Sequence, residues 1–79
     1  MKNNNLYTLK QAHQGEKLVI KSIKDSHLKN YLGQIGIFTD QEIIVTKIAP
    51  FGSMIAVLTN DTEIAIRKEV AEVIEVQSL

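Results

Sequence analysis

Residues 42–59 are the stretch that most restricts how this chain can fold. Two runs rich in isoleucine and valine are separated there by Pro50 and Gly52. β-branched side chains suit a pleated, half-buried strand better than a helix, where they crowd the preceding turn. Pro50 cannot donate to a strand ladder and Gly52 tolerates positive φ, so the chain is expected to turn at residues 49–53 and return antiparallel. The sequence predicts a β-hairpin with a bulged connection.

Three further strands are predicted on either side of this hairpin. Short apolar or alternating runs mark them at residues 16–23, 63–67 and 73–76. Gly15 supplies the turn into the earliest strand, and the polar residues 60–62 predict a tight hairpin turn, because Asn and Asp tolerate left-handed φ values. Five short strands of this kind suggest a small, partly open barrel, since closure protects apolar sheet edges.

One helix is predicted between the earliest strand and the central hairpin. Asp25 or Ser26 can cap its start, Gly36 fits its C-terminal end, and Thr39-Asp40 fits a turn after it. Four apolar residues at helical spacing share one face of this helix. They are Leu28, Tyr31, Leu32 and Ile35.

Shorter helical turns are expected at two other places. Thr8 and Gln11 have the spacing of a capping box, which satisfies backbone N–H groups at a helix start. Residues 68–71 form a polar turn with room for one helical coil. The 79 residues make a single domain, expected at residues 7–77, after an Asn-rich and flexible end at residues 1–6.

Composition and charge narrow the classes of function. The chain is 44% apolar and 23% charged, which is ordinary for a folded domain, and it has no cysteine for a disulfide or a thiolate metal site. The formal net charge of zero argues against an affinity based on neutralising phosphates. No apolar run approaches the roughly 20 residues that span a bilayer, and no signal peptide is visible. A cytoplasmic location is expected.

Three short segments, through their order and spacing, carry a family resemblance. They are Ile35-Gly36-Ile37, Ala49-Pro50-Phe51-Gly52 and Ala65-Ile66-Arg67. Over residues 7–76 the sequence resembles the FeoA family of small bacterial proteins linked to ferrous iron uptake. The resemblance implies a mainly β, SH3-like barrel of about five strands, with one α-helix inserted after the first strand and a short N-terminal helical turn.

Five residues belong to the structural motifs of this resemblance. They are Gly15, Gly36, Pro50, Gly52 and Arg67. At two positions where the family commonly has Pro-Gly, this chain has Gln14-Gly15 and Thr39-Asp40. These differences affect the rigidity of the loops more than the fold.

The resemblance also implies a mode of action. It points to a cytoplasmic accessory protein that contacts FeoB, a membrane ferrous iron transporter with a GTP-binding domain, and that could modulate that domain. The partner would hold it at the inner face of the membrane. The same barrel resembles the C-terminal domain of iron-dependent repressors, which binds other protein segments, so an interaction domain of that kind is the alternative. A homodimer through unpaired edge strands stays open.

Catalytic and metal sites have weak support in the sequence. Catalysis needs a nucleophile with a base, or two placed carboxylates, and no motif joins His13 to His27 or to such a group. Ferrous iron favours two histidines and a carboxylate, so His13, His27 and Asp25 are weak candidates that require the first loop to meet the helix start. No enzymatic activity and no cofactor are expected, with ferrous iron left open as a ligand.

Arg67 is the only arginine of the chain. A GTPase-activating role would need a mobile arginine near the nucleotide. The preferred interpretation is structural, with the aliphatic stem packed on the barrel and the guanidinium paired with Glu69 or Glu42.

Large apolar residues in or near loops suggest a surface for a protein partner. The hypothesis is that Tyr31, Phe51 and Met54 form it. Phe51 lies at the tip of the central hairpin and has an equally weighted alternative role as a plug of the barrel mouth.

Nucleic-acid binding is the other alternative, because small barrels often bind RNA through basic residues and exposed aromatics. Four lysines could form a modest stripe, but an ordinary solvated face is the preferred interpretation. They are Lys17, Lys21, Lys24 and Lys29. No nucleic-acid partner is expected.

Overall fold

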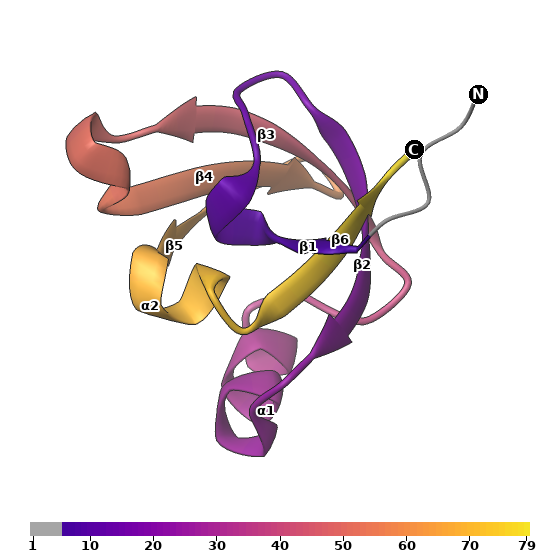
Figure 1. The fold of residues 1–79 in the computed structure, drawn as a ribbon. Coiled ribbons are helices and arrows are strands. Elements are labelled where there is room, and N and C mark those ends of the chain that lie inside the picture. Colours follow the sequence, from indigo (N-terminus) through magenta and orange to yellow (C-terminus); the bar gives the residue numbers. More distant parts are fainter. Residues whose placement is uncertain (1–5) are drawn as a thin grey trace.

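The central hairpin is present in the computed structural model, which describes residues 6–79 (Figure 1). Strands β3 (Glu42–Ile48) and β4 (Met54–Thr59) pair antiparallel, with a bulge between Val45 and Lys47. A 3-10 turn, η2 (Pro50–Gly52), connects them. Gly52 has a φ of 68° there, which confirms the predicted turn. The bulge lies within β3 rather than in the connection.

Strand β5 (Thr62–Arg67) follows β4 through a two-residue turn. Asn60 and Asp61 form this turn with φ values of 49° and 62°. Two successive left-handed residues are typical of the type I′ hairpin turn, whose twist matches that of the strands. The predicted turn and strand are confirmed.

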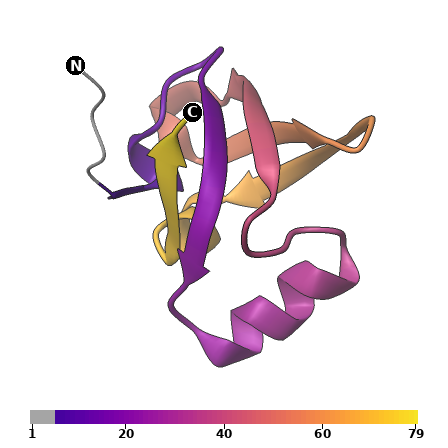
Figure 2. The same cartoon turned by 90° about the vertical axis from the view of Figure 1, so that its right-hand side faces the viewer.

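The two ends of the chain complete a six-stranded sheet. Strand β2 (Lys17–Ile23) pairs with β3 on one side and with β6 (Ile74–Ser78) on the other. Strand β1 (Tyr7–Thr8) adds to β6, so the order is β1-β6-β2-β3-β4-β5. Figure 2 shows β6 beside β2, with the α-helix α1 (Ser26–Gln34) below the barrel. The sequence predicted five strands and missed β1, because two residues are too short to show an alternation.

Helix α1 begins and ends with the predicted signals. The Asp25 carboxylate accepts a hydrogen bond from the backbone N–H of Leu28 at 3.0 Å, which makes Asp25 the N-cap. At the other end, the Ile37 N–H donates to the Leu32 carbonyl at 2.8 Å, and Gly36 has a φ of 97°. This bond, a second one from the Gly36 N–H to the Gly33 carbonyl at 3.3 Å and the left-handed glycine form a Schellman cap, so the helix is closed at both ends.

Two short helical turns cover the seam where the barrel is open. The 3-10 turn η1 (Leu9–Gln11) and the helix α2 (Lys68–Ala71) contact each other between the two ends of the sheet. In η1, the Gln11 side-chain oxygen accepts from the Thr8 backbone N–H at 3.0 Å, as the capping-box spacing predicted. The result is the mainly β, partly open barrel that the sequence indicated.

The core is built almost entirely from aliphatic side chains of the inward strand positions, with Leu9, Leu32 and Ala71 added by the helices and Ile37 by the loop after α1. Eleven of its large side chains are less than 2% exposed. They are Leu9, Leu18, Ile20, Leu32, Ile37, Ile43, Ile55, Ile74, Val45, Val57 and Val76. Within residues 6–79, no helix is long and apolar enough to cross a membrane. The expectation of a flexible end at residues 1–6 lies, for residues 1–5, outside the described part of the chain.

Candidate functional site

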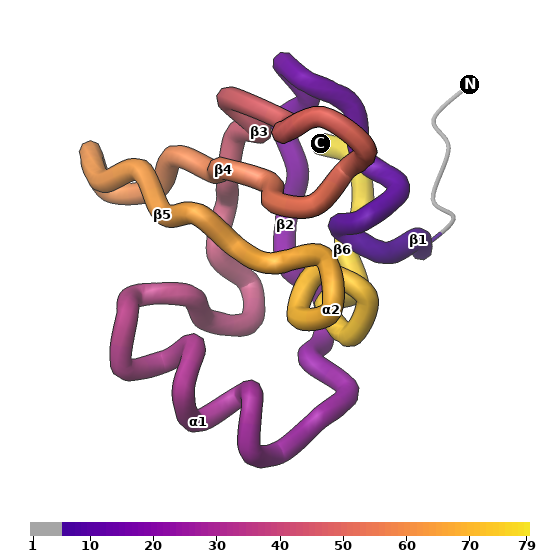
Figure 3. Tube along the Cα trace, turned by 90° about the vertical axis from the view of Figure 1, so that its left-hand side faces the viewer, coloured from indigo at the N-terminus to yellow at the C-terminus, as the bar shows by residue number. Residues whose placement is uncertain are grey.

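A groove of about 300 Å³ lies between helix α1 and strand β5. Figure 3 shows β5 running above α1, with α2 at the C-terminal end of β5. The lining is mainly apolar, apart from one arginine and the hydroxyl of a tyrosine. It consists of Tyr31, Leu32, Ile35, Met54, Ala65, Ile66, Arg67 and Val70.

Local structure explains why Tyr31 and Met54 meet here. On α1, Leu32 is buried in the core, which leaves the preceding residue, Tyr31, 52% exposed at the edge of the groove. In the β4–β5 ladder, Met54 lies directly opposite Arg67, and its side chain is 39% exposed. Two of the three residues predicted for partner binding therefore line one groove, although they come from separate elements.

The tip of the central hairpin carries the third predicted residue, Phe51. Its side chain is fully exposed, at 102% of the reference area, so the alternative role as a barrel plug is wrong. Phe51 also has a φ of 63°, which is unfavourable for a bulky residue. It does not line the groove, but Met54 begins the strand that follows the same turn.

Arg67 takes a different role from the expected one. It lines the groove, but no carboxylate of residues 6–79 lies within ion-pair distance, so the predicted pairing with Glu69 or Glu42 is wrong. Glu69 lines a second, neighbouring depression together with Arg67 and Lys68, but it forms no ion pair with either of them. The guanidinium therefore stands exposed beside an apolar surface.

The weak metal candidates lie in separate local arrangements. Asp25 caps α1, His27 is exposed on that helix, and His13 contacts Glu16 in the loop before β2, with 3.5 Å between Nδ1 and Oε1. Among residues 6–79, no three His, Cys, Asp or Glu side chains form a group suited to a metal ion. The structure does not bring this predicted set together.

A polar cluster that the sequence did not indicate surrounds Glu16. Its carboxylate accepts from the His13 backbone N–H at 2.6 Å and from the Tyr7 hydroxyl at 2.8 Å. The His13 N–H holds the pKa of Glu16 below its usual value, although burial opposes this. Burial raises the pKa of the Tyr7 hydroxyl. The Tyr7 hydroxyl also lies 3.0 Å from that of Ser78, so the cluster ties the first loop to the last strand.

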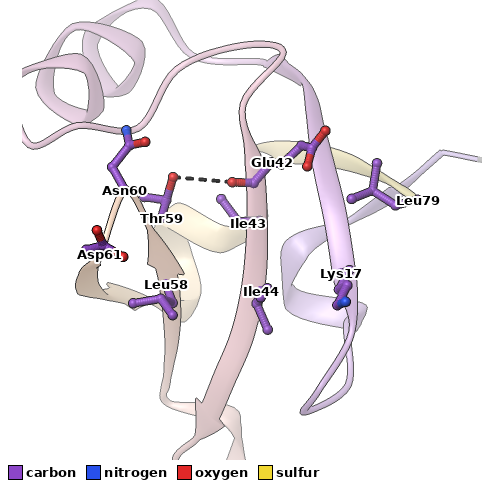
Figure 4. Close-up of a pocket in the computed structure, with 9 residues that line it drawn as sticks. All are labelled: Lys17, Glu42, Ile43, Ile44, Leu58, Thr59, Asn60, Asp61 and Leu79. Atoms are coloured by element: carbon purple, nitrogen blue, oxygen red, sulfur yellow. Dashed lines mark hydrogen bonds between the residues drawn. The ribbon is translucent and has the colours of Figure 1, made fainter.

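A larger and shallower cavity of about 520 Å³ crosses β2, β3 and β4 (Figure 4). The Thr59 hydroxyl donates to the Glu42 carbonyl at 3.2 Å within it, which ties the end of β4 to the start of β3. Its rim mixes Lys17 with Glu42 and Asp61. Among the four lysines that a basic stripe would need, Lys24 lies 3.4 Å from a carboxylate oxygen of Glu75.

Comparison with known proteins decides the family. The FeoA domain matches residues 7–78, almost the whole chain. The chain belongs to the FeoA family. No match was found among curated proteins.

Solved structures place this FeoA protein beside others with the same barrel. Iron(II) transport protein A from Clostridium thermocellum is 28% identical, with 92% of this chain and 46% of that chain covered and a TM-score of 0.86. A FeoA-like protein from Clostridium acetobutylicum is 25% identical, with 100% and 90% covered and a TM-score of 0.84. A manganese-dependent transcriptional repressor is 24% identical, with 98% and 44% covered and a TM-score of 0.85, which shows the fold alone. The SH3-like fold is confirmed.

Proposed function

We propose that this FeoA protein is a non-enzymatic accessory of bacterial ferrous iron uptake, which binds a FeoB-type membrane transporter by protein contact. The observation that carries the proposal is the exposure of Tyr31 and Met54 in one groove with Arg67, which has no ion pair within residues 6–79, and of Phe51 in the turn that leads into Met54, in a chain of the FeoA family. Aromatic residues, Met and Arg are enriched in the cores of protein interfaces, and a few of them usually dominate the binding energy.

The arrangement suits protein contact better than chemistry. The groove presents a guanidinium and apolar side chains, and no nucleophile beside a general base, among its lining residues. Its partner would be the cytoplasmic part of the transporter, so the protein is proposed to act in the cytoplasm at the inner face of the membrane. Modulation of GTP hydrolysis is one consequence that such contact allows.

Phe51 gives the sharpest test, because its side chain makes no buried contact. Phe51→Asn removes the ring and keeps a residue that tolerates positive φ, so the melting temperature should be unchanged or slightly higher. Binding to a detergent-purified FeoB-type transporter should weaken about tenfold or more, as expected for an aromatic residue that dominates an interface. Biolayer interferometry with immobilised transporter measures this change.

Phe38→Asn is the matched control. Phe38 is also an exposed aromatic, at 53%, but it lies in the loop after α1, whereas Phe51 lies in the turn that leads into Met54. Replacement of Phe38 should leave transporter binding unchanged. Failure of the wild-type chain to bind the transporter, or equal effects of both variants, would contradict the proposal.

A regulatory interaction domain is the second candidate, because the same barrel occurs in a manganese-dependent transcriptional repressor. In that case co-purification should recover a DNA-binding protein in place of the transporter. A steep loss of RNA binding with added salt would instead support the RNA-binding alternative.

A further inference from the structure

The turn between β4 and β5 determines which backbone N–H and C=O groups of β5 face β4 and which face the free edge. In a two-residue hairpin the flanking residues, here Thr59 and Thr62, exchange hydrogen bonds, and every second pair along the ladder does the same. The bond from the Lys68 N–H to the Ser53 carbonyl, at 3.1 Å, continues this alternation to the end of the strand. Even-numbered residues of β5 therefore bond to β4.

The odd-numbered residues of β5 point their backbone groups the other way. β5 is the last strand of the sheet order, and no turn or loop bond between described residues reaches the N–H or C=O of Glu63 or Ala65, or the N–H of Arg67. This free side of β5 lies toward α1 (Figure 3), where Ala65 and Arg67 line the groove together with Tyr31 of α1 and Ile35 just after it. Such an edge is a template for another extended chain.

Charges are distributed unevenly along this edge. Asp61 and Glu63 lie at its start, whereas Arg67 and Lys68 lie at its end, and neither cation has an ion pair within residues 6–79. A strand added antiparallel meets Arg67 with its first residue and Glu63 with its fifth. The Glu63 carboxylate already accepts a hydrogen bond from the Thr46 hydroxyl of β3 at 2.6 Å, so Arg67 is the stronger of the two charge contacts. Opposite charges at directly facing positions stabilise a strand pair, and like charges destabilise it.

We propose that β5 binds an extended five-residue segment of a partner protein as an antiparallel seventh strand. The segment carries an acidic residue first, large apolar residues second and fourth, and a basic residue fifth. The apolar side chains lie beside Ile66 and Ile64, on the side of the strand where α1 and Val70 form the groove. This inference rests on the proposed function for the identity of the partner and adds how that partner is held.

A second copy of the chain does not fit this edge. The β5 sequence itself, Glu63-Ile64-Ala65-Ile66-Arg67, has the required pattern. However, the free edge of β5 and helix α1 line the same groove, so two paired β5 edges would force two α1 helices into that space. A short extended segment that is not backed by a folded domain brings no second α1 to this groove.

The experiment is selection of short random peptides from a displayed library on the purified full-length protein. Selected peptides should be enriched in the pattern acidic, apolar, any, apolar, basic. Binding of such a peptide should slow hydrogen exchange of the Ala65 and Arg67 amides, measured by NMR, at least about tenfold. Selection on the Arg67→Glu variant should invert the preference at the first position from acidic to basic.

Backbone substitution provides a second, independent readout. Ala65→Pro removes only an edge-facing N–H and is tolerated in an edge strand, whereas Ala65→Val keeps that N–H. Peptide binding should be lost in the proline variant and kept in the valine variant, with both folded by circular dichroism. Peptides without the charge pattern, no protection of β5 amides, self-association through β5, or no selected peptide would each overturn the inference. Transporter binding that still depends on Phe51 would then leave the proposed function standing.

Discussion

Phe51 combines two features that rarely occur together in one residue. It is fully exposed, and its φ of 63° costs a non-glycine residue roughly 1–2 kcal/mol relative to the right-handed region. No packing of the ring offsets this cost, because the side chain makes no buried contact. The hairpin tip is therefore less stable than it could be, which is common where a residue is retained for binding.

Glu16 gives a pH-dependent contribution to stability. Its pKa is lowered in the folded state, first by the His13 N–H, so the ionised form stabilises the fold at neutral pH. That stabilisation is lost as the pH falls below the usual value of 4.5 and through the lower folded-state value. Glu16→Gln should lower the free energy of unfolding by about 1 kcal/mol at pH 7 and by less at pH 3, because protonation of Glu16 increasingly removes the difference as the pH falls. Urea denaturation at both pH values measures this difference.

Glu69→Gln is the control for this experiment. Glu69 is exposed and accepts no hydrogen bond from the described residues, so its replacement should change stability equally little at both pH values. Equal losses for Glu16→Gln at pH 7 and pH 3 would contradict the assigned role of the carboxylate.

At the scale of elements, helix α1 depends on the conformation of one glycine at its end. A Cβ at Gly36 would meet only Ile64 at 3.9 Å, so the space is available and the cost of Gly36→Ala is conformational. We expect a loss of about 1–2 kcal/mol, because φ is 97° there. Thermal denaturation followed by circular dichroism measures this loss.

Gly33→Ala is a matched substitution within the same helix. Gly33 has an ordinary helical conformation, and an added Cβ would lie 3.6 Å from the Phe38 ring, which is a normal contact. Alanine should stabilise the helix by about 0.5–1 kcal/mol. Opposite signs for the two variants support the Schellman cap, and equal signs would refute it.

Local signals in the sequence predicted most elements, because each signal acts within a few residues. The turn at Asn60 and Asp61, the Asp25 cap and the β-branched runs of the central hairpin all require particular φ values or side-chain packing at fixed positions. Strand β1 was missed because its two residues become a strand only by pairing with β6. The ion pair of Arg67 was wrong because the position of a long exposed side chain depends on the tertiary arrangement of its neighbours.

At the scale of the whole molecule, the candidate groove could not be predicted as a unit. Tyr31 and Met54 were chosen as exposed apolar residues, but their meeting depends on how α1 is placed below the free edge of β5. That placement follows from long-range packing of Leu32 and Ile37 into the core. Sequence reasoning identified two of the residues and missed the apolar floor that Ile35, Ile66 and Val70 provide.

The seam of the barrel depends on one small residue. Ala71 of α2 is completely buried where α2 contacts η1 and the β4–β5 pair. Ala71→Leu would overfill this contact, and we expect a loss of about 1–3 kcal/mol. Lys68→Leu, on the exposed side of the same helix, should change stability by less than about 0.5 kcal/mol. Urea titration of both variants tests whether the seam is as tightly packed as the rest of the core.

The position of β6 affects how the chain reaches this fold. β6 lies between β1 and β2, so the sheet is complete only after the last strand to be synthesised has inserted between two of the earliest. Pairing of such distant segments is slow, because closing a long loop costs conformational entropy before any favourable contact can form. A nascent chain whose residues 74–78 are still inside the ribosome leaves β1 and β2 without this neighbour. Folding should therefore finish only after residues 74–78 have left the ribosome, and chaperones that shield strand edges would then raise the yield.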